Sequence, residues 1–167
     1  MGKFLHGFLP SLHWRIVWNG VVLFPFPSLW RAAFCMARWP NLPVGRCVEV
    51  WNPHSNTMRG ARHSRVPRFM GMAVGCNDRL YFVGGIDHVF CGAMVTHCEV
   101  YDSSSCTWDL IQPMPRSVHL AGIHAGGSKF YVFGGAQMFY DGSTSTDFVQ
   151  VFDTVTNRWT REVSNLC

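Results

Sequence analysis

Short apolar runs separated by turn-forming polar residues dominate the chain after about residue 47. Two of these runs, at 79–83 and 129–133, each end in a Gly-Gly pair. Runs of this length with terminal glycines are typical of buried β-strands that end in a sharp bend. Stretches rich in Asx, Ser and Thr, at 52–57, 102–107 and 153–157, are turn signals between antiparallel strands. The pattern therefore predicts an all-β protein.

The same features recur in the same order about every 50 residues. The strand and Gly-Gly at 79–85 return at 129–135, and the motif at 99–102 returns at 150–153, offsets of 50 and 51. A partial earlier copy lies at 49–52, with Met58 where later copies have tryptophan. The structural repeat residues are Gly84, Gly85, Tyr101 and Trp108 in the first complete copy, and Gly134, Gly135, Phe152 and Trp159 in the second. A large ring at a fixed repeat position favours packing against a neighbouring repeat, so each repeat is predicted to form one four-stranded antiparallel sheet.

This pattern resembles the kelch repeat, which forms one blade of a β-propeller. The resemblance covers about residues 47–163 and implies a kelch β-propeller fragment, with half a blade at 47–65 and two full blades at 66–113 and 114–163. Residues 1–46 show neither the Gly-Gly nor an alternating strand, so we expect a non-repeat, poorly ordered N-terminal segment. Propellers close with roughly four to eight blades. Inter-blade faces should therefore stay uncovered in this chain.

Charge and cysteine content separate the two parts further. The first 46 residues carry five Lys or Arg and no acid, whereas the remainder carries nine Lys or Arg and ten Asp or Glu. The excess of basic over acidic residues thus lies outside the repeats, and nucleic-acid binding is not expected. The longest uncharged stretch, 16–30, is too short and too broken by Pro25 and Pro27 to span a bilayer. Seven cysteines without a C-x-x-C pair favour reduced thiols and a cytoplasmic protein.

No residue pattern indicates catalysis, so we expect no enzyme, no cofactor and no metal. The metal-ligand types in one stretch are His88, Cys91, His97, Cys98 and Cys106, without the paired spacing of a zinc site. A catalytic triad could be imagined from Asp109, Ser117, His119 and His124. Ser117, however, does not lie in the G-x-S-x-G motif of a nucleophile elbow. Galactose oxidase shares the kelch-type blade, but its copper ligands come from several blades, more than two blades can supply.

The resemblance points instead to protein binding. In kelch domains the arginines at the start of the first strand and the long connection after Gly-Gly lie on the ligand face, which implies partner contacts for Arg68 and Arg116. The connections, 86–96 and 136–146, supply the other candidates: His88, Phe90, Met138, Phe139 and Tyr140. Two alternatives remain open: these aromatics pack beneath the blade, and the arginine run at 59–68 is a solvated connection.

The resemblance is strongest to the BTB-kelch, or kelch-like, type. It implies a protein-protein interaction module that belongs to a substrate receptor of a cullin-RING ubiquitin ligase, with a protein as partner and with neither nucleic acid nor membrane involved. The alternatives are an actin or cytoskeleton-binding kelch protein and a truncated product without function of its own. The repeat alone does not separate these groups.

Overall fold

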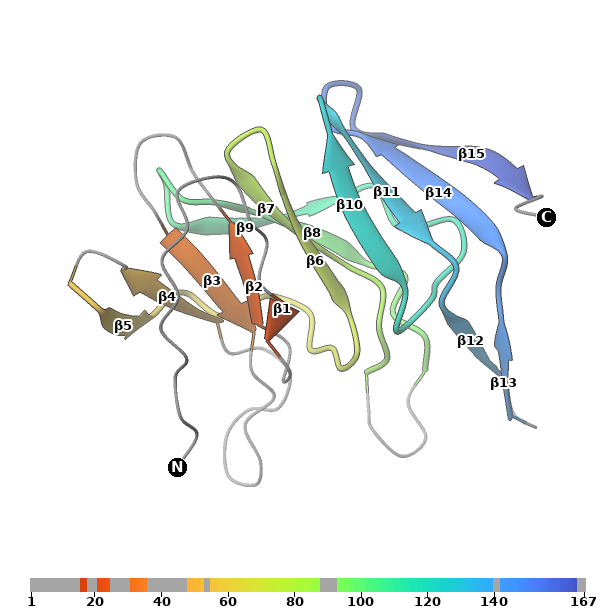
Figure 1. Cartoon of the computed structure of the whole chain (residues 1–167), viewed down its shortest axis with the longest axis horizontal. Coiled ribbons are helices and arrows are strands. Elements are labelled where there is room, and N and C mark those ends of the chain that lie inside the picture. Colours follow the sequence, from red (N-terminus) through yellow and green to blue (C-terminus); the bar gives the residue numbers. More distant parts are fainter. Residues whose placement is uncertain are drawn as a thin grey trace.

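The computed structural model describes the backbone of residues 16–17, 21–24, 31–35, 48–52, 55–87, 93–139 and 142–164. It describes the side chains of residues 48, 55–57, 60–87, 93–139 and 142–160. Every regular element within these ranges is a β-strand, and the sheets lie side by side in chain order (Figure 1). The all-β prediction is therefore confirmed.

Two four-stranded antiparallel sheets match the two predicted blades. The central blade contains β6 (Met72–Cys76), β7 (Arg79–Val83), β8 (Cys98–Asp102) and β9 (Thr107–Ile111) in that spatial order. The C-terminal blade contains β10 (Gly122–Gly126), β11 (Lys129–Phe133), β14 (Phe148–Asp153) and β15 (Arg158–Ser164). In each blade the repeat aromatic pairs with the repeat tryptophan: Tyr101 with Trp108 and Phe152 with Trp159. The predicted repeat period thus corresponds to one sheet.

The C-terminal blade carries an extra hairpin that the sequence analysis treated as an irregular connection. Strands β12 (Ala136–Phe139) and β13 (Gly142–Ser145) pair antiparallel with each other between β11 and β14. In Figure 1 the hairpin projects below its blade. Its composition, Gly-Ser-Thr on one strand, gave no apolar alternation from which a strand could be predicted.

The N-terminal sheet differs from the half blade that the repeat pattern predicted. Strands β4 (Val48–Asn52) and β5 (Thr57–Gly60) form the expected hairpin. Three further strands precede them in a five-stranded sheet: β1 (Ile16–Val17), β2 (Val21–Phe24) and β3 (Arg31–Cys35), and β3 pairs with β4. The sheet therefore extends into the segment that we expected to be non-repeat sequence. The rest of that segment lies outside the described residues.

Aromatic side chains join the two complete blades. The Tyr81 ring of the central blade lies 5.1 Å from the Phe130 ring and 5.9 Å from the Phe152 ring of the C-terminal blade, measured between centroids. Phe130 and Phe152 are fully buried, and Trp159 packs edge-on against both. Rings that tilt against each other at these distances stabilise the contact beyond the area they bury. One hydrophobic core thus runs through both blades.

The Gly-Gly pair of the central blade is required by a close backbone approach. Gly84 and Gly85 have φ angles of +64° and +93°, in the left-handed region. The Gly85 amide donates to the Val118 carbonyl of the next blade at 2.9 Å. A Cβ at Gly84 would collide with that same carbonyl and lie 2.7 Å from Cε of Met72. Glycine here permits both the bend and the contact between blades.

Candidate functional site

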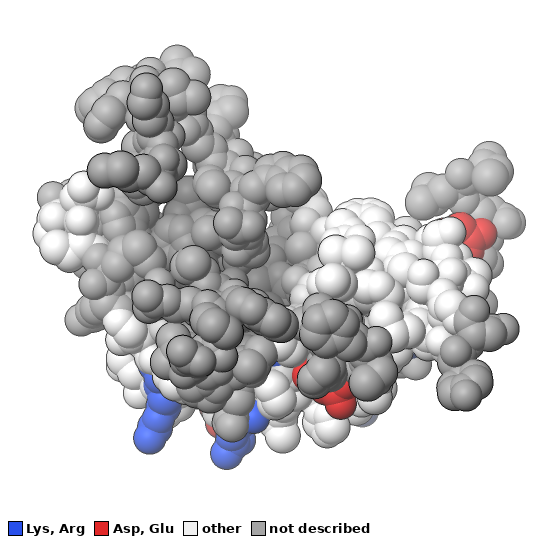
Figure 2. Space-filling model, turned by 90° about the horizontal axis from the view of Figure 1, so that it is seen from below, with Lys and Arg blue, Asp and Glu red and all other residues white. Residues whose placement is uncertain are grey.

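The candidate site lies along one edge of the blades, called here the lower edge. It contains the segments before β6 and β10, 61–71 and 112–121, and the described parts of the connections that follow the Gly-Gly pairs, 84–87, 93–97, 134–139 and 142–147. The tight turns at 77–78, 103–106, 127–128 and 154–157 lie at the opposite edge, because successive strands run antiparallel. Figure 2 views the molecule from the lower edge, where a few charged side chains project from a largely uncharged described surface.

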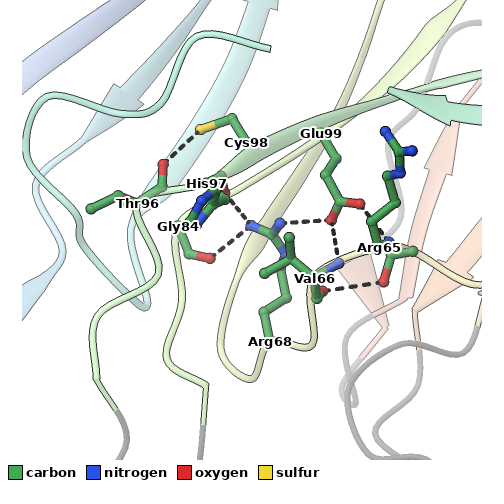
Figure 3. Close-up of polar contacts among 9 residues, drawn as sticks. Arg65, Val66, Arg68, Gly84, Thr96, His97, Cys98 and Glu99 are labelled. Atoms are coloured by element: carbon green, nitrogen blue, oxygen red, sulfur yellow. Dashed lines mark hydrogen bonds and ion pairs between the residues drawn. The ribbon is translucent and has the colours of Figure 1, made fainter. Parts of the chain in front are cut away.

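Arg68, predicted to contact a partner, lies inside the central blade instead. Its side chain is fully buried, and Nη2 forms an ion pair with Oε2 of Glu99 at 2.8 Å (Figure 3). Nη1 donates to the carbonyls of Gly84 and His97 at 3.1 and 3.0 Å. The guanidinium also lies 4.8 Å from the centre of the Phe82 ring. Arg68 therefore ties the segment before β6 to β7 and β8, and its buried guanidinium is not exposed to a partner.

Glu99 completes this buried unit, which we call the Arg68–Glu99 socket. Besides the ion pair, its carboxylate accepts hydrogen bonds from the backbone amides of Arg65 and Val66 at 2.6 and 3.4 Å. A buried carboxylate is tolerated when opposite charge and hydrogen bonds replace its hydration. The socket thereby fixes the chain that leads into β6.

The C-terminal blade has the same socket in neutral form. Gln150 takes the place of Glu99: its Oε1 accepts from the Arg116 amide at 3.0 Å, and its Nε2 donates to the Arg116 carbonyl at 2.8 Å. Val118, which is fully buried, precedes the bend residue His119 as Arg68 precedes Phe69. Arg116 lies two residues before Val118, as Val66 lies two residues before Arg68, so it is the counterpart of Val66 rather than of Arg68. Both arginines follow a proline, which makes them look equivalent in the sequence, whereas counting back from the Gly-Gly pairs places Val118 at the position of Arg68.

Arg116 keeps the exposure that a partner contact needs. Its side chain is exposed, and its guanidinium lies 4.9 Å from the centre of the Phe148 ring. Arg65 and Arg62, in the equivalent segment before the central blade, are exposed as well. In the part of the chain that the structure describes, the ion pairs are Arg68–Glu99 and Arg79–Asp102, so these three arginines have no acidic partner there.

The hairpin β12–β13 brings apolar groups to the same edge. Gln137 donates from Nε2 to the Ser117 carbonyl at 3.3 Å, which ties the hairpin to the segment of Arg116. Met138 is half-buried, and its amide contacts Sδ of Met94 at 3.4 Å. Phe139 is 53% exposed, so its ring does not pack beneath the blade. His88, Phe90 and Tyr140 lie outside the described residues.

Of the residues considered for metal binding, His88 and Cys91 lie outside the described residues, and the described ones form no metal cluster. Cys98 is buried, and burial raises the pKa of its thiol to about 12, although the nearby Arg68 charge opposes the rise. His119 and Ser117 are also buried, and Nδ1 of the first and Oγ of the second have no hydrogen-bond partner among the described residues. Among the described residues, no three His, Cys, Asp or Glu side chains are placed to hold a metal ion. In the same residues, no helix is long and apolar enough to cross a membrane.

Four-stranded antiparallel sheets packed against each other in chain order define the blades of a β-propeller. A family model described as the Kelch motif matches residues 116–162, nearly the whole C-terminal blade. Together with the relatives below, this match makes the chain a kelch-repeat protein. Kelch domains generally bind protein partners, so the repeats form a protein-interaction module.

The relatives found among curated proteins carry the same repeat. Kelch-like protein 35 of Mus musculus is 32% identical over 114 residues, which cover 68% of this chain and 19% of the relative. Kelch-like protein 26 of Danio rerio is 32% identical over 98 residues, covering 58% and 16%. An F-box/kelch-repeat protein of Arabidopsis thaliana is 31% identical over 113 residues, covering 68% and 27%. The matched part of this chain thus spans less than a third of each relative.

Proposed function

We propose that this chain contributes to the substrate-binding propeller of a cullin-RING ubiquitin ligase in the cytoplasm, and that it binds its protein partner through the lower edge. Similarity to two kelch-like proteins and to an F-box/kelch-repeat protein supports the proposal. We expect the chain itself to recruit rather than catalyse. The ligase machinery would act on the protein that it holds.

One observation carries the choice of surface: Arg116 and Phe139 are both exposed on segments that the Gln137–Ser117 hydrogen bond joins. Aromatic and arginine side chains are enriched where proteins bind one another. The unpaired guanidinium groups of Arg65 and Arg116 favour carboxylates, which they can bind in bidentate fashion. The partner that fits this edge is therefore an acidic segment with an adjacent apolar side chain.

The test compares proteins captured by the chain with those captured by a double variant, Arg116→Glu with Phe139→Ser. We expect the variant to lose the specific partners, because it removes the apolar anchor and repels acidic groups. Arg158→Glu is the matched control: it makes the same charge change on an exposed residue at the opposite edge. The captured proteins should also be less ubiquitinated in cells that lack the chain.

Two results would count against the proposal. Partners that bind the double variant as well as the wild type would place recognition elsewhere. A role as a ligase receptor would be contradicted if ubiquitination of the partners did not depend on the chain. It would also be contradicted if the chain co-sedimented with actin filaments and the double variant did so too.

A further inference from the structure

Two residues of the lower edge combine a strained backbone with an exposed apolar side chain. Met70 and Leu120 have φ angles of +52° and +54°, in the left-handed region. Their side chains are 45% and 67% exposed. They occupy equivalent positions in the two complete repeats, and the Leu120 amide donates to the Met70 carbonyl at 3.1 Å, so the two residues are neighbours across the blades. We call them the Met70–Leu120 pair.

The bend in the backbone does not explain why these side chains are large and apolar. Left-handed positions favour Gly, Asn and Asp, whereas bulky residues adopt them at a cost. Five other non-glycine residues in the described part of the chain have a positive φ, and four of these are Asn or Asp: Asn56, Asn77, Asp78 and Asn157. Backbone hydrogen bonds of the preceding residues, Phe69 and His119, already fix the bends. An asparagine would therefore keep either bend with less strain.

Strain and exposure at the same two positions point to a contact outside the chain. Strained backbone conformations persist mainly at functional sites, where the surrounding structure holds them. Methionine is flexible and polarisable, which suits it to apolar partners of varied shape. The pair lies on segments 61–71 and 112–121 and is thus continuous with the lower edge that carries Arg116 and Phe139, the edge that Figure 2 faces. Cover by a bound partner would offset both costs.

We propose that the Met70–Leu120 pair binds an aliphatic side chain of the protein partner, as a second apolar anchor besides Phe139. This inference rests on the proposed function and specifies its partner further. The spacing of the two anchors follows from the backbone. The bridge between His119 and Ala136 is antiparallel, so Leu120 and Phe139 lie in opposite directions from it, one and three residues away. At about 3.4 Å per residue, their Cα atoms lie within about 15 Å of each other.

Charge defines the rest of the partner segment. Arg62 and Arg65 are exposed on the segment of Met70, and Arg116 is exposed on the segment of Leu120. None of the three arginines has an acidic partner among the described residues. Acidic side chains of a partner would pair with these guanidinium groups. The partner class is therefore an extended peptide segment with two apolar side chains, about four residues apart, next to Asp or Glu.

Selection from random peptides displayed on phage tests this class on the intact chain. Peptides selected on the wild type should share two apolar positions and neighbouring acidic residues. On a Met70→Asn/Leu120→Asn variant, one apolar preference should disappear while the acidic preference remains. Synthetic copies of the selected peptides should bind this variant at least about tenfold more weakly, because one aliphatic side chain stays in water. Val155→Asn is the control, since Val155 is 75% exposed at the opposite edge, and it should leave the affinity unchanged.

Thermal unfolding separates a binding role of the pair from a structural one. The Met70→Asn/Leu120→Asn variant should melt about 2–4 °C higher than the wild type, because asparagine relieves the left-handed strain and removes exposed apolar surface. A variant that binds more weakly yet melts higher supports the proposal. A lower melting temperature would show that the two side chains stabilise the fold, and would overturn it.

The peptide selection also distinguishes failure of this inference from failure of the proposed function. An acidic preference that Arg116→Glu abolishes, without any apolar preference that depends on the Met70–Leu120 pair, would overturn the second anchor and leave the proposed function standing. Absence of any selected peptide on the wild type would overturn the anchor as well. Peptides that depend on the pair support the anchor even if the ubiquitination of matching proteins is independent of the chain, which would contradict the ligase role alone.

Discussion

At the scale of single residues, the two sockets hold the segment before the first strand of each blade with different side chains. The central blade buries a charged pair, Arg68 with Glu99, whereas the C-terminal blade buries Val118 with Gln150. Removing one member of a buried ion pair leaves an uncompensated charge, which costs about 3–5 kcal/mol. Replacing both members by groups of suitable shape is often neutral or stabilising. The C-terminal blade thus shows how this fold accommodates a neutral socket.

The comparison of the two sockets predicts that substitutions at Arg68 and Glu99 change the free energy of unfolding in a strongly non-additive way. Arg68→Val alone should lower the free energy of unfolding by about 3–5 kcal/mol, because Glu99 loses its counter-charge. Adding Glu99→Gln should recover most of that loss, since the amide can bond to the backbone of Val66 as Gln150 bonds to that of Arg116. Urea unfolding of the two single variants and the double variant measures the coupling. Additive losses would show that the two residues act independently.

A second residue-scale prediction concerns the contact between blades. Gly84→Ala should destabilise the chain by about 1–3 kcal/mol from the left-handed backbone alone, with the collision against the Val118 carbonyl adding to the loss. The control is Gly60→Ala, where a Cβ would meet nothing within 4 Å. Thermal unfolding of both variants makes the comparison. Equal melting temperatures for the two would contradict the role assigned to Gly84.

At the scale of elements, each blade is linked to the segment that precedes it by a tryptophan. The indole N–H of Trp108 donates to the Arg62 carbonyl at 2.8 Å, and that of Trp159 donates to the Gln112 carbonyl at 2.9 Å. The Trp159 amide also donates to Oε1 of Gln112 at 2.7 Å. The last strand of a blade therefore anchors the connection through which the chain entered that blade.

Loss of this anchor should be measurable in both blades. Trp108→Phe and Trp159→Phe each remove one indole hydrogen bond and part of a buried ring, and we expect each to cost about 1–3 kcal/mol. Tyr131→Phe is the control, because it removes a polar atom from a half-buried ring on β11 that does not link the blade to the preceding segment. Chemical unfolding followed by circular dichroism compares the three. If the control costs as much as the tryptophan variants, the anchor is not what stabilises the connection.

The elements of the two complete blades were predictable because their signals are local. Apolar runs that end at Gly84 and Gly134, and polar turns before Trp108 and Trp159, mark the strand ends directly. The pairing of Arg68 with Glu99 was not predictable, because it joins residues 31 apart and the sequence shows only that arginine precedes a strand. The hairpin β12–β13 was not predicted, because its strands show no alternation of apolar and polar residues.

At the scale of the whole molecule, the central blade is the protected one. Strand β6 contacts β2 of the N-terminal sheet on one side and β10 of the C-terminal blade on the other. The strands β1 to β3 that make this possible carry no Gly-Gly and little alternation, so the pairing of β3 with β4 could not be derived from the repeat. Register in such a sheet depends on neighbours in space rather than on local sequence.

Hydrogen exchange should reveal this difference in cover. The amides of β7 should exchange more slowly than the equivalent amides of β11, because local opening is easier where one face of a sheet meets water. Exchange measured by mass spectrometry compares the two strands in one sample. The turns at 77–78 and 127–128 supply the internal reference for fast exchange. Equal protection of β7 and β11 would contradict the proposed order of stability.

The charged and neutral sockets also restrict how these repeats can be recombined. Each socket is assembled from two stretches of chain, one before the first strand of the blade and one on its third strand. A crossover that exchanges one stretch between the blades without the other would bring Glu99 beside Val118, or Arg68 beside Gln150. Either hybrid would leave one buried charge without its partner. Duplicated repeats of this kind can therefore be exchanged as whole blades but not as half blades.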